Sequence, residues 1–313
     1  MNETDTLRAL ETLNARSIEL RASAEYAAGV RQKNLRRLTS DLSPAGIKKA
    51  FHEFQKFRAF SKAPRHPDVP NLSPSEWKAS LRTGDKSKRV VVYSCIVGNY
   101  DLPLAPVWQA PNISYVLFLE GQDASFVDGW EVRPIPEEVR AASGGSATGI
   151  NRYIKFHPYE LFADDFDASI YVDGNIQPVS DLSYYADLIR PEAGIALHHH
   201  RVRTSIADEV QACKALDKGD GAKMDAQVAR YVAAGFPLDY GLLECNVIAS
   251  DLHSELGRQV FADWWEEFTT SGSGRDQLAL PYVLWQHGVP FEAVATMGRN
   301  AYADTKIFIA SHN

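Results

Sequence analysis

Short apolar runs alternate with helical patterns along the chain from residue 89 onward. Five of these runs are long enough for buried strands, namely 89–97, 113–120, 168–173, 193–200 and 242–250. Apolar residues recur at helical spacing in six further segments, namely 151–162, 181–189, 205–216, 222–235, 254–268 and 275–288. Strands that alternate with helices favour a mostly parallel sheet covered on both faces. The predicted fold class is therefore α/β.

The first 85 residues follow a different pattern. Apolar positions without an intervening proline predict a helix over residues 1–38, and a second helix is predicted over 44–60. The apolar residues of the first helix that recur at this spacing are Leu7, Leu10, Leu13 and Ile18. Four prolines within residues 61–77 indicate a linker. We therefore expect a helical extension with a Pro-rich linker over 1–85 and an α/β domain over 86–313.

Charge is divided unequally along the chain. Residues 1–65 carry 13 Lys and Arg against 7 Asp and Glu, a net charge of +6, whereas the remaining residues carry −13. The predicted helix over 44–60 places phenylalanines on one face and basic residues on the other. We interpret the apolar face as one that docks on the α/β domain or on a second copy of the chain. The alternative is a peripheral contact with an anionic membrane, and no nucleic-acid partner is predicted.

The composition is that of a soluble globular protein. Hydrophobic residues make up 45% of the 313 residues, which is enough for one large core. No apolar run approaches the roughly 20 residues of a membrane span, and the first residues do not resemble a signal peptide. We therefore expect a cytoplasmic protein, with attachment to the inner face of the membrane as the alternative. Cys95, Cys213 and Cys245 lack disulfide or zinc-site spacing and are predicted to be buried thiols.

The segment SIYVDGNI, residues 169–176, carries an acid and an amide out of a buried strand. Asp173 and Asn175 are two positions apart, so both can present oxygen to one hard cation, while Gly174 lets the backbone approach a ligand closely. We predict a Mn²⁺ or Mg²⁺ site with Asn175 as the weaker ligand, so that Asn175→Asp should tighten the metal. The alternative is an ordinary hairpin turn, because Asp-Gly sequences are common in turns.

Other polar residues also follow predicted strands, and in parallel α/β sheets ligands bind at the carboxyl ends of the strands. The loop VGNYD after the first strand, which begins at Val97, places Gly98, Asn99, Tyr100 and Asp101 where a nucleotide base and ribose would lie; the alternative is a plain exit from the strand into a loop. Arg152 and Lys155 are three positions apart on one helical face. They either neutralise a diphosphate or are two solvated charges.

Three consecutive histidines end the fourth predicted strand. Alternation along a strand points His198 and His200 the same way, and no third zinc ligand is present in the segment. We therefore predict that one of these two imidazoles, His198 or His200, joins the cation of Asp173, with Arg201 or Arg203 reaching a phosphate.

The segment RDQ, residues 275–277, opens a predicted helix after a Gly/Ser stretch. There Arg275, Asp276 and Gln277 are suited to gripping sugar hydroxyls, and the alternative is an ordinary helix N-terminus, which favours Asp. Trp264 and Trp265 follow each other on a helix, so only one can line a site, and we expect them to belong to the core.

Seven of these motifs occur in the order seen in a known family. The chain resembles the glycosyltransferase-like family that includes the plant mucilage-related and turgor-regulating proteins, formerly a domain of unknown function. The resemblance covers about residues 90–290. The motifs are YSCIVGNYD, NRYIKFHPYELF, SIYVDGNI, HHHRVR, YVAAGFPLDYGLLECNVIAS, WWEEF and RDQLALPYVLWQHG.

The resemblance implies a nucleotide-sugar transferase of GT-A architecture. In GT-A enzymes an acidic motif after a strand binds Mn²⁺ or Mg²⁺ and the sugar diphosphate, and Asp173 matches its first acid. The RDQ segment is similar to the Asp-Gln motif of glycogenin-type transferases, which implies a sugar-contacting role for Asp276 and Gln277. The implied partners are a nucleoside diphosphate sugar, above all a UDP-sugar, and a glycan or lipid-linked acceptor in cell-surface polysaccharide synthesis.

The implied reaction is transfer of a hexose-like group to a hydroxyl. Negative charge develops on the leaving diphosphate, so the metal and the cationic side chains would act electrostatically, with Lys155 foremost among them. An inverting reaction needs a general base, for which Glu244 and Asp276 are candidates, whereas a retaining reaction needs none. Two alternatives stay open: a metal-dependent hydrolase built on His198, His200 and Asp173, and a non-catalytic nucleotide- or glycan-binding module.

Overall fold

The computed structural model describes residues 2–22, 43–48, 51, 83–122 and 126–311. Residues 44–48 are helical, as predicted. The rest of the predicted basic helix, the second part of the first helix and the Pro-rich linker lie outside the described residues.

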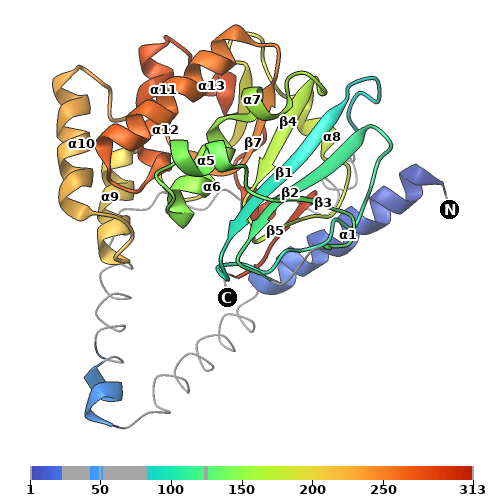
Figure 1. Cartoon of the computed structure of the whole chain (residues 1–313), viewed down its shortest axis with the longest axis horizontal. Helices are drawn as coiled ribbons and strands as arrows, with labels where there is room; N and C mark the ends of the chain where they lie inside the picture. Colours follow the sequence, from blue (N-terminus) through green and yellow to red (C-terminus); the bar gives the residue numbers. More distant parts are fainter. Residues whose placement is uncertain (1, 23–42, 49–50, 52–82, 123–125, 312–313) are drawn as a thin grey trace.

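A six-stranded sheet forms the centre of the described structure, in the order β3-β2-β1-β4-β7-β6 (Figure 1). Its strands are β1 (Val90–Val97), β2 (Ile113–Glu120), β3 (Glu131–Arg133), β4 (Ala168–Val172), β6 (Ile195–His199) and β7 (Leu243–Asp251). The pairs β1–β2, β1–β4 and β2–β3 are parallel, whereas β7 is antiparallel to both β4 and β6. The five predicted strands and the α/β class are confirmed. The antiparallel course of β7 was not predicted, and it reverses which end of that strand lies at the ligand-binding edge.

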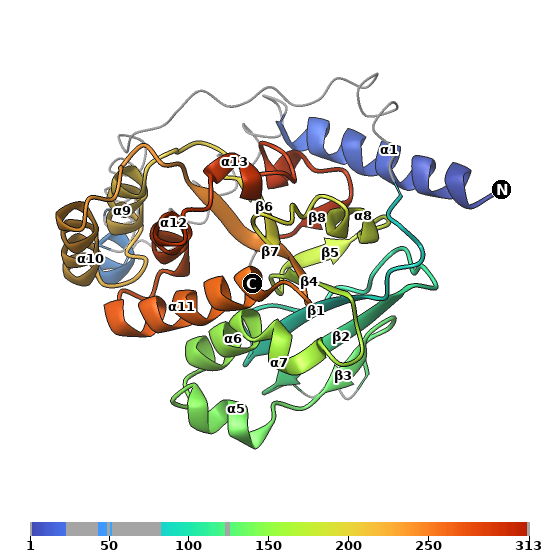
Figure 2. The same ribbon diagram turned by 90° about the horizontal axis from the view of Figure 1, so that it is seen from above.

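Helices cover one face of this sheet. The helices of this layer are α5 (Glu137–Ala142), α6 (Ala147–Phe156), α7 (Pro158–Phe162), α11 (Glu255–Ser271) and α12 (Asp276–Gln286). Their buried side chains form one core with the alternate residues of β1 that face them, such as Tyr93. Trp264 is fully buried in this layer, as expected, and Cys95, Cys213 and Cys245 are buried free thiols, as predicted. Two further helices, α9 (Ile206–Ala215) and α10 (Gly221–Ala233), pack beside α12 (Figures 1 and 2).

Smaller elements cover the opposite face (Figure 2). They are β5 (Ile176–Pro178), α8 (Ser183–Ala186), the 3-10 turn η1 (Ala301–Ala303) and β8 (Ile307–Ile309). Helix α13 (Phe291–Val294) contacts β6 and belongs to the core of the helical face. β5 and β8 form an antiparallel two-stranded sheet of their own. The three-residue strands were not predicted because they are too short to show a periodic pattern.

Helix α1 (Glu3–Ala22) confirms the first predicted helix over the part that is described, and it packs against the C-terminal segment. The Glu11 carboxylate accepts from Lys306 Nζ at 2.8 Å, and Asn14 Nδ2 donates to the carbonyl oxygens of Thr305 and Ile307, both at 2.8 Å. Leu13, expected on the apolar face, is 63% exposed. The buried face of α1 instead combines Leu7 with the polar residues Glu11 and Asn14, which follow it by four and seven positions. Polar contacts therefore contribute to the docking of α1.

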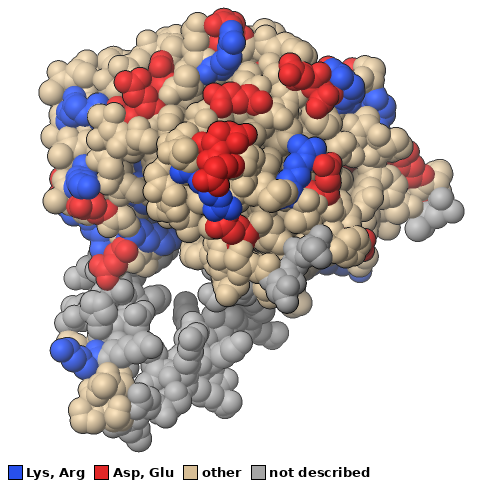
Figure 3. Space-filling view, in the orientation of Figure 1, with Lys and Arg blue, Asp and Glu red and all other residues tan. Residues whose placement is uncertain are grey.

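No helix among the described residues is long and apolar enough to cross a membrane. On the face drawn in Figure 3, acidic and basic side chains of the described residues are interspersed over the helices and strands.

Candidate functional site

A cavity of about 730 Å³ opens where the carboxyl ends of β1 and β4 and the segment after β6 meet the amino end of β7. Because β7 runs antiparallel, its first residues rather than its last reach this edge. The predicted site residues that line the cavity are Val97, Asn99, Tyr100, Arg152, Lys155, Asp173, Gly174, Asn175, His200, Glu244, Arg275, Asp276 and Gln277. The structure thus brings together residues that are separated by up to 180 positions in sequence.

Three predicted site residues lie outside this cavity lining. The Gly98 N–H donates to the Glu120 carbonyl at 2.8 Å, and a φ of 73° explains glycine at that position. The Arg201 guanidinium lies over the ring of Tyr302, 5.7 Å from its centroid. His198 Nε2 lies 2.8 Å from Asp304 Oδ2, which also accepts from the hydroxyl of Tyr185.

Strand alternation had pointed His198 and His200 the same way. In the structure, the two histidines do not share one metal site with Asp173. A β-bulge between Leu197 and His198 shifts the pairing of β6 with β7, so simple alternation does not extend through the histidines. The hydrolase alternative, which needs both imidazoles beside Asp173, loses one of its ligands for the same reason.

The turn 173–175 is a backbone turn, but it is not a hairpin within the main sheet. The Ile176 N–H donates to the Asp173 carbonyl at 2.9 Å, and the chain then leaves β4 to form β5, which pairs with β8. A Cβ at Gly174 would lie 2.7 Å from Ile96 Cγ1 and 3.2 Å from Asp101 Oδ2. Only glycine fits this close approach, which places the turn directly against the end of β1.

Asn175 is buried and is held by the C-terminal segment. Its Nδ2 donates to the Ala310 carbonyl at 2.7 Å, and the Ala310 N–H donates to the Asn175 carbonyl at 2.9 Å. The amide is therefore used structurally through its nitrogen, a donor that an aspartate lacks.

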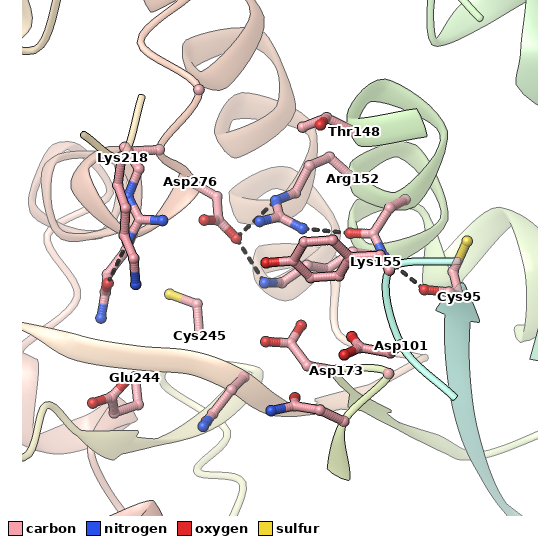
Figure 4. Close-up of a pocket in the computed structure, with 18 of the residues that line it drawn as sticks. Cys95, Asp101, Thr148, Arg152, Lys155, Asp173, Lys218, Glu244, Cys245 and Asp276 are labelled. Carbon is pink, nitrogen blue, oxygen red and sulfur yellow. Dashed lines mark hydrogen bonds and ion pairs between the residues drawn. The ribbon is translucent and has the colours of Figure 1, made fainter. Parts of the chain in front are cut away.

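A buried ion cluster stands at the centre of the cavity (Figure 4). Asp276, at the start of α12, accepts from Lys155 Nζ at 2.6 Å and lies 3.2 Å from Arg152 Nε, both on α6. Lys155 is 1% exposed and Asp276 is 4% exposed. Burial alone would raise the pKa of Asp276, but the positive charges of Arg152 and Lys155 outweigh it and lower that pKa. The two cations expected to face a diphosphate are thus already paired with the acid expected to grip the sugar.

Neighbouring side chains hold this cluster in place. Trp264 Nε1 donates to the Asp276 carbonyl at 2.9 Å, and Gln277 Nε2 donates to the Leu243 carbonyl at 2.7 Å. Asn151 Nδ2 donates to the Cys95 carbonyl at 2.7 Å, and its Oδ1 accepts from Arg152. Asn151 was missed by sequence reasoning, although it lies in the same segment as Arg152.

His200 has a defined protonation state. Its Nδ1 accepts from the backbone N–H of Arg203 at 2.9 Å, and burial lowers its pKa to about 4. The neutral ring therefore carries its proton on Nε2, which lies 3.6 Å from carboxylate oxygens of both Glu209 and Glu244. Burial raises the pKa of Glu244 to about 7.

Among the cavity residues that the structure describes, the donor set fits a hard cation beside the turn 173–175. No three His, Cys, Asp or Glu side chains among the described residues are grouped closely enough to hold a metal ion by themselves. Asp101 and Asp173 nevertheless both line the cavity beside the turn, and Figure 4 shows their carboxylates next to each other. Such oxygens suit Mn²⁺ or Mg²⁺ together with ligand phosphates. His200 does not fit, because Nδ1 is occupied and Nε2 carries the proton.

One comparison with known protein families agrees with the resemblance. Residues 152–297 match the family model of the TOD1/MUCI70 glycosyltransferase-like domain. The chain is similar to mouse xyloside xylosyltransferase 1, with 12% identity, a TM-score of 0.39, and coverage of 64% of this chain and 82% of that one. It is also similar to galactosyltransferase LgtC, solved with donor and acceptor sugar analogues, with 11% identity, a TM-score of 0.37 and coverage of 62% and 70%. No curated protein sequence matches the chain.

Proposed function

We propose that this chain, whose residues 152–297 match the family model of the TOD1/MUCI70 glycosyltransferase-like domain, transfers a sugar from a nucleoside diphosphate sugar to a hydroxyl of a glycan or lipid-linked acceptor. The observation that carries the proposal is that the carboxylates of Asp101 and Asp173 share one cavity with the buried ion cluster of Arg152, Lys155 and Asp276. We propose a UDP-sugar as the donor and Mn²⁺, or Mg²⁺, as the cofactor.

The carboxylates of Asp101 and Asp173 would hold the divalent cation. When bound, that cation neutralises charge on the donor diphosphate as the glycosidic bond breaks. The Val97–Tyr100 loop would lie beside the nucleotide, because it adjoins Asp101 on the same edge of the sheet.

Lys155 and Arg152 would stabilise the charge that develops on the leaving group. Asp276 pairs with both of them, so they are held in place before the donor binds and need no reorganisation during the reaction. The cluster as a whole has a net charge of +1, since one carboxylate opposes two cations.

Glu244 would act as the general base if the reaction inverts the anomeric centre. Burial places its pKa near 7, which allows it to accept a proton from the acceptor hydroxyl at neutral pH. Asp276 is less suited to this role, because its neighbours lower its pKa and both cations occupy its carboxylate.

Calorimetric titration of UDP with and without Mn²⁺ tests the proposal directly. Wild-type protein should bind UDP more tightly with Mn²⁺, and Asp173→Asn should remove that dependence while keeping the shape of the turn. Activity of Asp173→Asn should fall by roughly 10² to 10³, the scale of losing one strong electrostatic contact in the transition state. Equal UDP affinity in both proteins, with and without Mn²⁺, would exclude the metal site. UDP binding without consumption of any UDP-sugar would favour the non-catalytic binding module.

A further inference from the structure

The end of the cavity away from Asp101 is rich in basic side chains. We call Arg203, Lys218 and Arg275 the basic end; they come from the segment after β6, the loop before α10 and the N-cap of α12. Figure 4 shows Lys218 and Asp101 at opposite sides of the site, with Asp276 between Lys218 and Arg152.

One carboxylate serves both guanidinium groups of the basic end. Glu209 accepts from Arg203 Nε and lies 3.5 Å from Arg275 Nη2. His200, whose Nε2 lies 3.6 Å from a carboxylate oxygen of Glu209, contributes no charge because its ring is neutral. Arg203 and Arg275 thus share the carboxylate of Glu209, and Lys218 adds a third positive charge at the cavity wall, so a surplus of positive charge remains at this end of the cavity.

The basic end also has unused hydrogen-bond donors. Arg203 is only 7% exposed, yet its Nη1 has no hydrogen-bond partner among the described residues, and the same holds for Arg275 Nε. A buried donor without a partner is costly, so such groups in a cavity wall indicate a missing ligand. A carboxylate or phosphate would supply pairs of acceptor oxygens in the geometry that guanidinium groups prefer.

We propose that the basic end binds an anionic group of the acceptor, either a sugar carboxylate or a phosphate. This inference rests on the proposed function, because it assigns the Asp101 end to the donor and the remaining cavity to the acceptor. It narrows the acceptor from any hydroxyl compound to an acidic one. Lys218, which is exposed at the wall, supplies a charge that attracts the anion, while Arg203 and Arg275 orient it.

Binding of small probes to the purified full chain tests the inference without turnover. The probes are glucuronate for the carboxylate, glucose 6-phosphate for the phosphate, glucose as the neutral counterpart, and UDP with Mn²⁺ for the donor site. At least one anionic probe should bind wild-type protein about tenfold or more tightly than glucose, and which of the two binds identifies the anion. Lys218→Ala should lower the affinity for that probe by about tenfold, the scale of one charge-assisted hydrogen bond.

Lys223→Ala is the matched control, because Lys223 is an exposed lysine on α10 outside the cavity lining. It should leave every affinity unchanged. The inference is overturned if neither anion binds more tightly than glucose. It is also overturned if Lys218→Ala lowers the affinity for UDP as much as the affinity for the anion, because that result would assign the basic end to the donor diphosphate. Failure of the proposed function looks different: UDP would not bind to wild-type protein, whatever the anionic probes do.

Discussion

Removing the charge of Asp276 should destabilise the protein strongly, and this is the sharpest test of the ion cluster. Asp276→Asn keeps the size of the side chain and one acceptor oxygen, but it leaves Lys155 buried without an opposite charge. Breaking a buried ion pair by neutralising one partner costs about 3–5 kcal/mol. With an unfolding entropy of about 2.1 cal/mol/K per residue and 313 residues, the melting temperature should fall by about 5–8 °C.

Thermal and urea unfolding of wild type, Asp276→Asn, Lys155→Met and the double variant provide the measurement. The matched control is Glu266→Gln, because Glu266 is an exposed acid on α11. The double variant should lose less stability than the sum of the two single losses, since each single change leaves the other group unpaired. Additive losses, or an Asp276→Asn protein as stable as the Glu266→Gln control, would refute the ion-cluster account.

The stability difference between wild type and Asp276→Asn should depend on pH in a defined direction. The pKa of Asp276 is lowered in the folded protein, so its carboxylate stabilises the fold above the unfolded pKa of about 4. This contribution is lost as pH falls toward the folded pKa. The stability difference between wild type and Asp276→Asn should therefore be full at pH 7 and shrink below about pH 4.

Two further predictions follow from the site and from α1. Glu244→Gln should lower the rate of transfer by roughly 10² to 10⁴ while leaving the affinity for UDP unchanged. It should also abolish the rise of activity with pH near 7 that wild-type protein shows, because that rise follows the titration of Glu244. An unchanged pH profile would exclude Glu244 as the base. Glu11→Gln should cost about 3–5 kcal/mol in urea unfolding, because it removes the charge of the buried carboxylate that pairs with Lys306 Nζ, and an effect under 1 kcal/mol would show that α1 does not depend on this contact.

The main strands could be predicted from the sequence because each is a continuous apolar run buried on both faces. The direction of β7 could not, since a buried run has the same composition whichever way it runs. That direction decides the site: it brings Glu244 rather than the far end of β7 to the ligand edge.

Most of the cavity residues could also be predicted, because polar residues at strand ends converge in α/β sheets. Their pairings could not. Asp276 and Lys155 are 121 positions apart, and nothing local in either segment indicates that one neutralises the other. The basic end was missed as a group for the same reason, because Arg203, Lys218 and Arg275 lie on three separate segments that only the packing of α9, α10 and α12 brings together.

Asn175 shows how such contacts change a prediction made from sequence. The motif alone suggests that Asn175→Asp would complete an acidic pair and tighten the metal. In the structure Asn175 Nδ2 donates to the Ala310 carbonyl, whereas an aspartate would place a second acceptor against that oxygen. We therefore expect Asn175→Asp to lose about 1–3 kcal/mol of stability without metal and to recover part of it when Mn²⁺ is added. Asn175→Ala is the control, since it loses the donor but adds no charge and should not respond to Mn²⁺ more than wild type. An Asn175→Asp protein as stable as wild type in the absence of metal would show that the contact with Ala310 contributes nothing to the fold.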